Sequence, residues 1–158
     1  MTSFDRLLLA IADVEFIIVG GVAGGLHGAA RATYDLDIVY RRDAANLARL
    51  VEALARFTPY LRGAPPGLPF RWDAETLARG LNFTLTTAVG DIDLLGEVIG
   101  GGGYEDLLLE SIDIEVFGIR CRCVSLPMLI ALKRAAGRPR DFDAIAELEA
   151  LLDEQRAN

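Results

Sequence analysis

The chain has 158 residues, of which 52% are hydrophobic and 25% charged, and its formal net charge is −7. This length suffices for one domain that buries roughly two-thirds of the surface of its unfolded chain. The acidic balance argues against broad nucleic-acid binding, which draws its affinity from neutralised phosphates. No apolar run is long enough to span a membrane, and the segment before Phe16 carries charges instead of a signal-peptide core. We therefore expect a cytoplasmic protein with a single domain over residues 1–158.

The N-terminal half predicts helices and strands in alternation. Apolar residues at helical spacing follow Ser3 and again follow Asp43, and both polar residues are suited to cap a helix. The segment after the first strand is rich in small residues, so we expect its helix to pack closely on the sheet. The expected elements are a helix at 3–12, a strand at 16–19, a helix at 22–30, a strand at 35–40 and a helix after Asp43.

The C-terminal half predicts two hairpins and then helices. Residues 63–69, GAPPGLP, cannot hold regular structure and are expected to form a loop beside the functional cleft. The remaining expected elements are strands at 81–87 and 91–95, a helical turn at 104–109, strands at 112–116 and 119–124, a helix from Ser125 to about 136, and a last helix through Leu152. The prediction is an α/β (α+β) fold in which helices flank a mixed β-sheet. Its core spans about 1–124 and its C-terminal helical segment about 125–154.

Two cysteines lie two positions apart on the last predicted strand, Cys121 and Cys123. This spacing fits neither a C-x-x-C redox pair nor a metal site. Adjacent positions on one strand face do not favour a mutual disulfide either. We expect both cysteines to be reduced and structural.

The most informative stretch is the glycine turn Gly20-Gly21 followed by Asp35 and Asp37. Because side chains alternate along a strand, the two aspartates share a face, and two anions so close repel unless a cation lies between them. Magnesium prefers such oxygen ligands. The glycines let the backbone approach a ligand, and the helix after them directs free amides at an anion. The sequence therefore predicts that metal and phosphate bind in one place.

Two other phosphate-binding patterns fit less well. The cluster GGVAGG follows a strand, as a dinucleotide fingerprint does, but no G-x-G-x-x-G register can be placed on it. A ribose-binding acid would also end its strand, whereas Asp35 and Asp37 open theirs. A P-loop would need a Gly-Lys-Ser/Thr sequence, which is absent here. A glycine-rich packing helix with Asp35 as a turn residue explains the glycines but not the second aspartate on the same face.

The order of these motifs resembles the signature of the DNA polymerase β-like nucleotidyltransferase superfamily. The first motif is Val19-Gly20-Gly21, a spacer, and Asp35-Leu36-Asp37-Ile38. The segment GDIDLLGEV at 90–98 stands where that superfamily has its third carboxylate. Residues 126–151 resemble the C-terminal helices of bacterial minimal nucleotidyltransferases and AbiEii-type toxin transferases. The resemblance implies a nucleotidyltransferase fold with C-terminal helices.

The resemblance also implies roles for particular residues. Asp35 and Asp37 would bind Mg²⁺, with two ions expected, and Asp93 would join them and act as the general base. The neighbouring Asp91 shares the strand face of Asp93, so it is either the third carboxylate or a turn residue. The residues implied to contact the nucleotide are Gly20, Gly21 and Lys133. Further candidates, each equally suited to a structural role, are Arg31, Thr33, His27 and Arg138.

The implied reaction moves a nucleoside monophosphate from a nucleoside triphosphate to a hydroxyl group and releases pyrophosphate. The acceptor is a protein, a tRNA end or a small molecule, and no residue selects among them. An alternative is a catalytically idle module that binds a nucleotide or a partner protein, for instance in a toxin–antitoxin system. Its partner would be a cognate antitoxin or a second copy of the chain. Phe70 and Trp72, beside the proline-rich loop, either stack on a nucleobase or complete the core.

Overall fold

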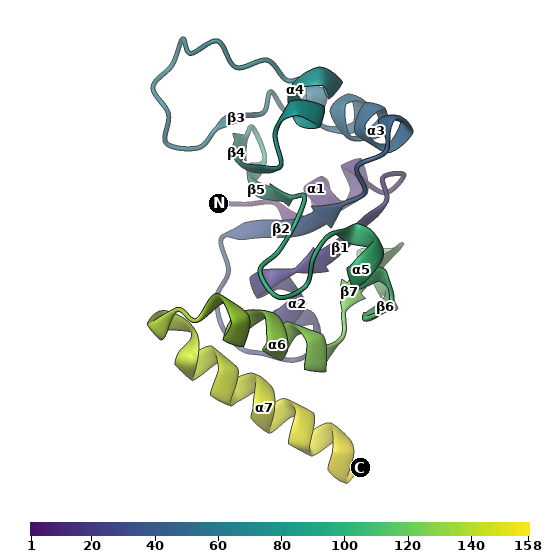
Figure 1. The fold of residues 1–158 in the computed structure, drawn as a ribbon, viewed down its shortest axis with the longest axis vertical. Helices are drawn as coiled ribbons and strands as arrows, with labels where there is room; N and C mark the ends of the chain where they lie inside the picture. Colours follow the sequence, from purple (N-terminus) through teal and green to yellow (C-terminus); the bar gives the residue numbers. More distant parts are fainter.

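The computed structural model describes residues 1–158 and shows a mixed β-sheet between two groups of helices (Figure 1). The sheet has seven strands in the order β3-β4-β5-β2-β1-β7-β6. The pairs β2–β5 and β1–β7 are parallel and the other pairs are antiparallel. The strands are β1 (Phe16–Val19), β2 (Asp35–Tyr40), β3 (Tyr60–Leu61), β4 (Asn82–Thr87), β5 (Gly90–Leu95), β6 (Ser111–Val116) and β7 (Ile119–Val124). The expected mixed sheet with flanking helices is confirmed.

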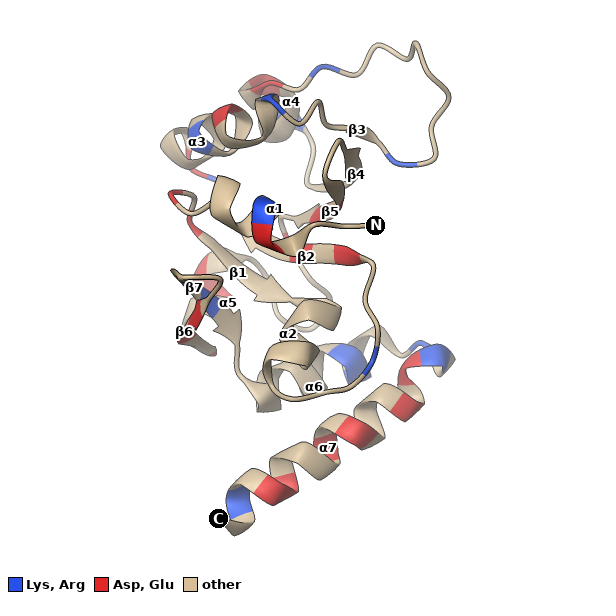
Figure 2. Ribbon diagram, turned by 180° about the vertical axis from the view of Figure 1, so that it is seen from behind, with Lys and Arg blue, Asp and Glu red and all other residues tan.

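The helices lie in layers on the two faces of the sheet. Figures 1 and 2 show α1, α3 and α4 on one face and α2, α6 and α7 on the other. The helices are α1 (Phe4–Ala10), α2 (Gly20–Leu26), α3 (Ala44–Ala55), α4 (Ala74–Arg79), α5 (Tyr104–Leu108), α6 (Leu126–Ala136) and α7 (Phe142–Ala157), with a short 3₁₀ helix, η1 (Pro139–Asp141), before the last. No helix has both the length and the apolar character that crossing a membrane requires.

Strand β2 lies in the middle of the sheet, and its side chains alternate between the two faces. Leu36 and Ile38 are fully buried in the hydrophobic core, whereas Asp35 and Asp37 are only partly buried and point to the opposite face. Strand β1 beside it is apolar and buried along its whole length. The strand that carries the aspartates is therefore held by the core on one side and free to carry polar groups on the other.

Side-chain caps fix the start of three helices. The side chain of Asp43 accepts a hydrogen bond from the Asn46 amide, and Ser125 accepts one from the Met128 amide, as the sequence predicts. Asp73 caps α4 in the same way. Ser3 occupies the N-cap position of α1, as expected, but its side chain makes no capping hydrogen bond. The left-handed Gly137 (φ 64°) ends α6 and allows the chain to turn into α7.

Several boundaries differ from those expected. Helix α2 occupies 20–26 instead of 22–30, because the chain enters the helix at Gly20 itself and leaves it before Gly28, whose φ is 108°. Helix α7 continues to Ala157 because its exposed end consists of good helix formers. Strand β3 and helix α4 were not predicted. Strand β3 has two residues and helix α4 has six, and such short segments show no clear hydrophobic periodicity.

Cys121 and Cys123 are both buried in β7, and neither forms a disulfide, as expected. Burial raises the pKa of both Cys121 and Cys123, the latter to about 12. Both groups are therefore neutral thiols at physiological pH, as expected of structural cysteines.

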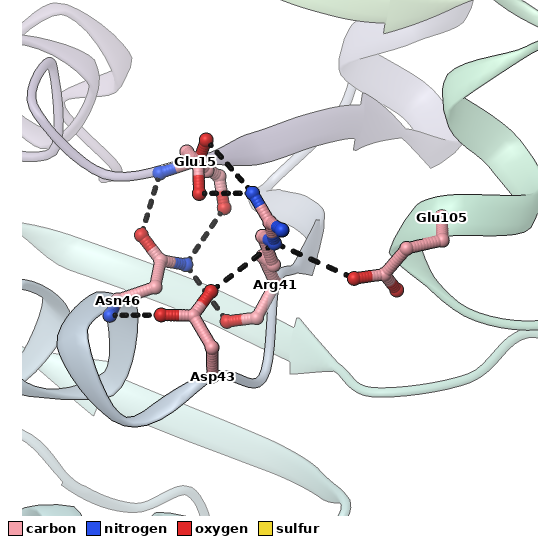
Figure 3. Close-up of polar contacts among 5 residues, drawn as sticks. All are labelled: Glu15, Arg41, Asp43, Asn46 and Glu105. Atoms are coloured by element: carbon pink, nitrogen blue, oxygen red, sulfur yellow. Dashed lines mark hydrogen bonds and ion pairs between the residues drawn. The ribbon is translucent and has the colours of Figure 1, made fainter.

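A buried polar residue joins the ends of β1, β2 and α3 (Figure 3). Asn46 is fully buried; its Oδ1 accepts a hydrogen bond from the Glu15 amide at 2.8 Å. Its Nδ2 donates to the carbonyl groups of Glu15 and Arg41, at 3.0 and 2.7 Å. Above it the Arg41 guanidinium pairs with Glu15, Asp43 and Glu105. Asn46 thus provides hydrogen-bond partners for backbone groups of the segments before β1 and after β2.

We expect Asn46→Ala to lower the free energy of unfolding by about 2–4 kcal/mol, because the Glu15 amide and the Arg41 carbonyl lose their partners inside the protein. Urea unfolding followed by circular dichroism measures the change. Arg49→Ala, on an exposed position of the same helix, is the control and should change stability by less than about 0.5 kcal/mol. Equal effects of the two changes would contradict a bridging role for Asn46.

Candidate active site

The parallel pairing of β2 with β5 builds a cluster of carboxylates. The register places Asp35 opposite Asp91 and Asp37 opposite Asp93. Residues opposite one another on neighbouring strands point to the same face, so all four side chains emerge together. One carboxylate oxygen from each of Asp35, Asp37 and Asp93 lies within 4.8 Å of the other two. These three residues could hold a metal ion.

Asp37 is the most strongly perturbed member of the cluster. Burial, followed by the charges of Asp35 and Asp93, raises its pKa to about 8. Its Oδ1 atom is buried and accepts no hydrogen bond. Burial also raises the pKa of Asp93, although the guanidinium of Arg62 opposes that shift. A buried oxygen without a partner, next to two further anions, fits a divalent cation.

The glycine turn lies directly against this cluster. Antiparallel pairing sets Val19 opposite Asp37, so the next residue, Gly20, meets the Asp37 carboxylate at the start of α2. Gly20 has φ 68°, and a Cβ atom there would overlap Asp37 Oδ2. Gly21 faces Thr33 instead: a Cβ on Gly21 would lie 2.6 Å from Thr33 Oγ1. Gly20 thus lets α2 pack closely on Asp37, and Gly21 lets it pack closely on Thr33.

A pocket of about 380 Å³ opens beside the aspartates, within the range of small-molecule sites. Strands β1, β2 and β5 supply one wall and helix α6 the other, and the segment that follows β5 lies at its edge. Its lining includes both polar residues of and next to the carboxylate cluster and apolar residues from α6. The lining residues are Val19, Gly20, Asp37, Asn82, Asp93, Leu95, Glu97, Val98, Ile99, Leu129, Leu132, Lys133, Ala136 and Arg138.

Two cations line this pocket opposite the carboxylates. Lys133 Nζ lies 4.0 Å from Asp141 Oδ1, and Arg138 Nε lies 2.7 Å from Asp141 Oδ2. Asp141 is buried, and its carboxylate forms ion pairs with both cations. Lys133 and Arg138 therefore pair with an acid of the turn after α6 and also line the pocket.

The other sequence-predicted candidates make structural contacts. His27 Nε2 lies 2.8 Å from the Val124 carbonyl oxygen, and Arg31 pairs with Glu147 of α7 at 3.2 Å. Neither residue lines the pocket. Thr33 Oγ1 donates to the Asp35 carbonyl at 3.3 Å, next to the cluster. Thr33 is thus placed to orient the strand that begins at Asp35.

The two aromatic candidates near the proline-rich loop pack on the body of the protein. Trp72 donates its indole N–H to the Val51 carbonyl at 2.9 Å. The ring of Phe70 meets Tyr60 edge to face, with centroids 6.0 Å apart. Neither ring lines the pocket.

One residue of the site was missed by sequence reasoning. Arg62 follows β3 and extends into the carboxylate cluster, where its Nη2 lies 2.8 Å from Asp93 Oδ1. Its Nε lies 3.3 Å from Asp91 Oδ2 and its Nη1 3.6 Å from Asp35 Oδ2. No pattern marks this arginine, since β3 has only two residues. Its position immediately before the GAPPGLP loop, which the sequence placed beside the cleft, was the one signal available.

The fold is similar to the crystal structure of a Thermotoga maritima protein proposed to be a nucleotidyltransferase. The two chains superpose with a TM-score of 0.54 at 16% sequence identity, over 98% of this chain and 96% of the other. The chain has a nucleotidyltransferase-like fold, as the sequence predicted. No protein-family model and no curated protein sequence matches the chain.

Proposed function

We propose that this protein is a metal-dependent nucleotidyltransferase that moves a nucleoside monophosphate from a nucleoside triphosphate to a hydroxyl group. The observation that carries the proposal is the convergence of Asp35, Asp37 and Asp93 within 4.8 Å beside the pocket that Lys133 lines. Phosphoryl transfer relies mainly on positioning and charge neutralisation. Carboxylates that would bind metal on one side of the pocket and the cationic side chain of Lys133 on the other would supply both positioning and charge neutralisation.

The proposed roles follow the positions of the residues. Asp35, Asp37 and Asp93 would hold Mg²⁺, two ions in all, which when bound neutralise phosphate charge and make the attacking hydroxyl more acidic. Asp93, which lines the pocket beside Asp37, would accept the proton of that hydroxyl. Gly20 and Gly21 would present the first amides of α2 to the phosphates. The apolar lining from α6 would hold the less polar part of the nucleotide.

Transfer of label from nucleoside triphosphates tests the proposal. The purified protein is incubated with each of the four triphosphates, labelled at the α-phosphate or the γ-phosphate, in the presence of Mg²⁺ and a cell lysate as the source of acceptor. Label from the α-phosphate alone should enter a larger product, and EDTA or Asp93→Asn should stop it. Transfer of the γ-phosphate would indicate a kinase. Nucleotide binding without transfer would favour the idle partner-binding module.

Lys133→Ala should weaken binding of a triphosphate about tenfold or more and that of the monophosphate much less, because the lysine faces the outer phosphates in the proposed arrangement. Isothermal titration calorimetry at fixed Mg²⁺ and ionic strength measures both constants. Arg134→Ala, the next position of α6, is the matched control: Arg134 pairs with Glu149 of α7 and does not line this pocket. Equal weakening of both ligands by Lys133→Ala would indicate a structural lysine.

A further inference from the structure

The guanidinium of Arg62 occupies the same carboxylates that are proposed to bind metal. It contacts Asp93 at 2.8 Å, Asp91 at 3.3 Å and Asp35 at 3.6 Å. Two of these three acids belong to the group whose oxygens converge within 4.8 Å. A second cation among those oxygens would meet both the atoms and the charge of the guanidinium. Arg62 and a metal ion would therefore compete for the oxygens of Asp35 and Asp93.

The backbone and the side chain of Arg62 make different contacts. The Arg62 amide donates to the Thr84 carbonyl at 3.0 Å, which continues the pairing of β3 with β4. The side chain is 26% exposed, so part of it already contacts solvent. Its Nη2 donates to Asp93 Oδ1 and to the Leu85 carbonyl, whereas its Nε is buried and makes no hydrogen bond. The guanidinium is thus held by ion pairs with three carboxylates and by one hydrogen bond to a backbone carbonyl.

We propose that Arg62 is an internal competitor of the divalent metal. In the metal-free protein its guanidinium neutralises the carboxylate cluster, and metal binds only as the side chain swings out toward solvent while the backbone stays paired with β4. This inference rests on the proposed function, because it takes the cluster to be the metal site. Its consequence is that metal affinity is lowered by the ion pairs that must be broken, and that the metal-free fold is protected from its own clustered charge.

Metal titration of the purified protein tests the competition without any assay of activity. Binding of Mn²⁺ and Mg²⁺ to wild type, Arg62→Gln and Arg62→Lys is measured by calorimetry, and thermal unfolding is measured in EDTA and in excess metal. Arg79→Gln is the matched control, because it removes the same charge from an exposed arginine that pairs with Glu75.

Arg62→Gln should bind Mn²⁺ about tenfold more tightly than wild type, a typical size for coupling between two sites. In EDTA its unfolding temperature should fall below that of wild type, and excess metal should raise it by a larger step. Arg62→Lys keeps the charge without the planar fork and should lie between the two. Arg79→Gln should match wild type in both measurements.

Equal or weaker Mn²⁺ binding by Arg62→Gln would overturn the competition and leave the proposed function intact. Should Arg62→Gln fail to fold, Arg62→Lys decides in the same way, since tighter binding than wild type supports competition and unchanged binding refutes it. Absence of metal binding in wild type and in both variants would instead overturn the metal site itself, and with it the proposed function.

Discussion

Replacing Asp35 and Asp37 together with asparagine should abolish Mg²⁺-dependent nucleotide binding, with a loss of at least about a hundredfold in affinity. The change removes two of the three carboxylates whose oxygens converge. Neutral amide oxygens remain, but they cannot offset the charge of a hard divalent cation. Calorimetric titration of the nucleotide at fixed Mg²⁺ measures the loss.

The same change should not unfold the metal-free protein. The pKa of Asp37 is about 8 in the folded protein, against an ordinary value of 3.8. An acid whose pKa is raised by folding favours the fold while protonated, and that contribution is lost as the pH rises from about 4 to about 8. The amide that replaces the Asp37 carboxylate does not titrate, so in EDTA the double variant should be more stable than wild type at pH 8, by about 1–3 kcal/mol.

Asp91→Asn is the matched control for the double variant. Asp91 lies on the same strand face and pairs with Arg62, but it does not belong to the converging group. Its replacement removes one negative charge from the same neighbourhood and should leave Mg²⁺-dependent nucleotide binding within a few-fold of wild type. A loss as large as that of the double variant would make Asp91 a metal ligand, and wild-type binding by the double variant would disprove the metal site.

Gly20→Ala should disrupt the site from the opposite side. A Cβ at Gly20 would overlap Asp37 Oδ2, and the φ of 68° is strained for any residue with a side chain. We expect a loss of about 1–3 kcal/mol in unfolding free energy. Because Asp37 must move, Mn²⁺ affinity should fall by about tenfold or more. Calorimetry and urea unfolding measure the two effects.

Gly25→Ala provides the control within the same helix. A Cβ at Gly25 would meet no atom within 4 Å, and its φ is not in the left-handed region. Alanine favours a helix over glycine by up to about 1 kcal/mol, so this variant should be as stable as wild type or more so. Retention of normal Mn²⁺ affinity by Gly20→Ala would show that Asp37 is not held in place by the glycine turn.

The parts of the site that depend on strand periodicity could be predicted from the sequence. The spacing of Asp35 and Asp37 fixes their common face, and the apolar neighbours of Asp93 mark a core strand. The family resemblance places Asp93 with Asp35 and Asp37, which requires β5 to lie beside β2, and the register confirms this pairing. The assignment of Lys133 to the nucleotide stays a prediction, although the residue does line the pocket.

Contacts made by isolated side chains could not be predicted. Arg62 reaches the cluster from a two-residue strand, and His27 and Arg31 are held by residues far along the chain, Val124 and Glu147. Such contacts depend on how elements distant in the sequence pack together, and the local hydrophobic pattern does not indicate them. The same holds for Asn46, whose three side-chain hydrogen bonds join segments that the sequence shows only as separate elements.

The central position of β2 links the site to the most protected part of the molecule. Strand β2 is bonded to β1 on one side and β5 on the other, so its backbone amides should be among the slowest to exchange with deuterium. Opening that separates β2 from β5 would require the core of the protein to unfold. Local fluctuations of the outer strands or of α7 should therefore leave the carboxylate geometry unchanged. Metal binding should therefore be lost only on global unfolding, and species in which only the outer strands or α7 have opened should retain the site.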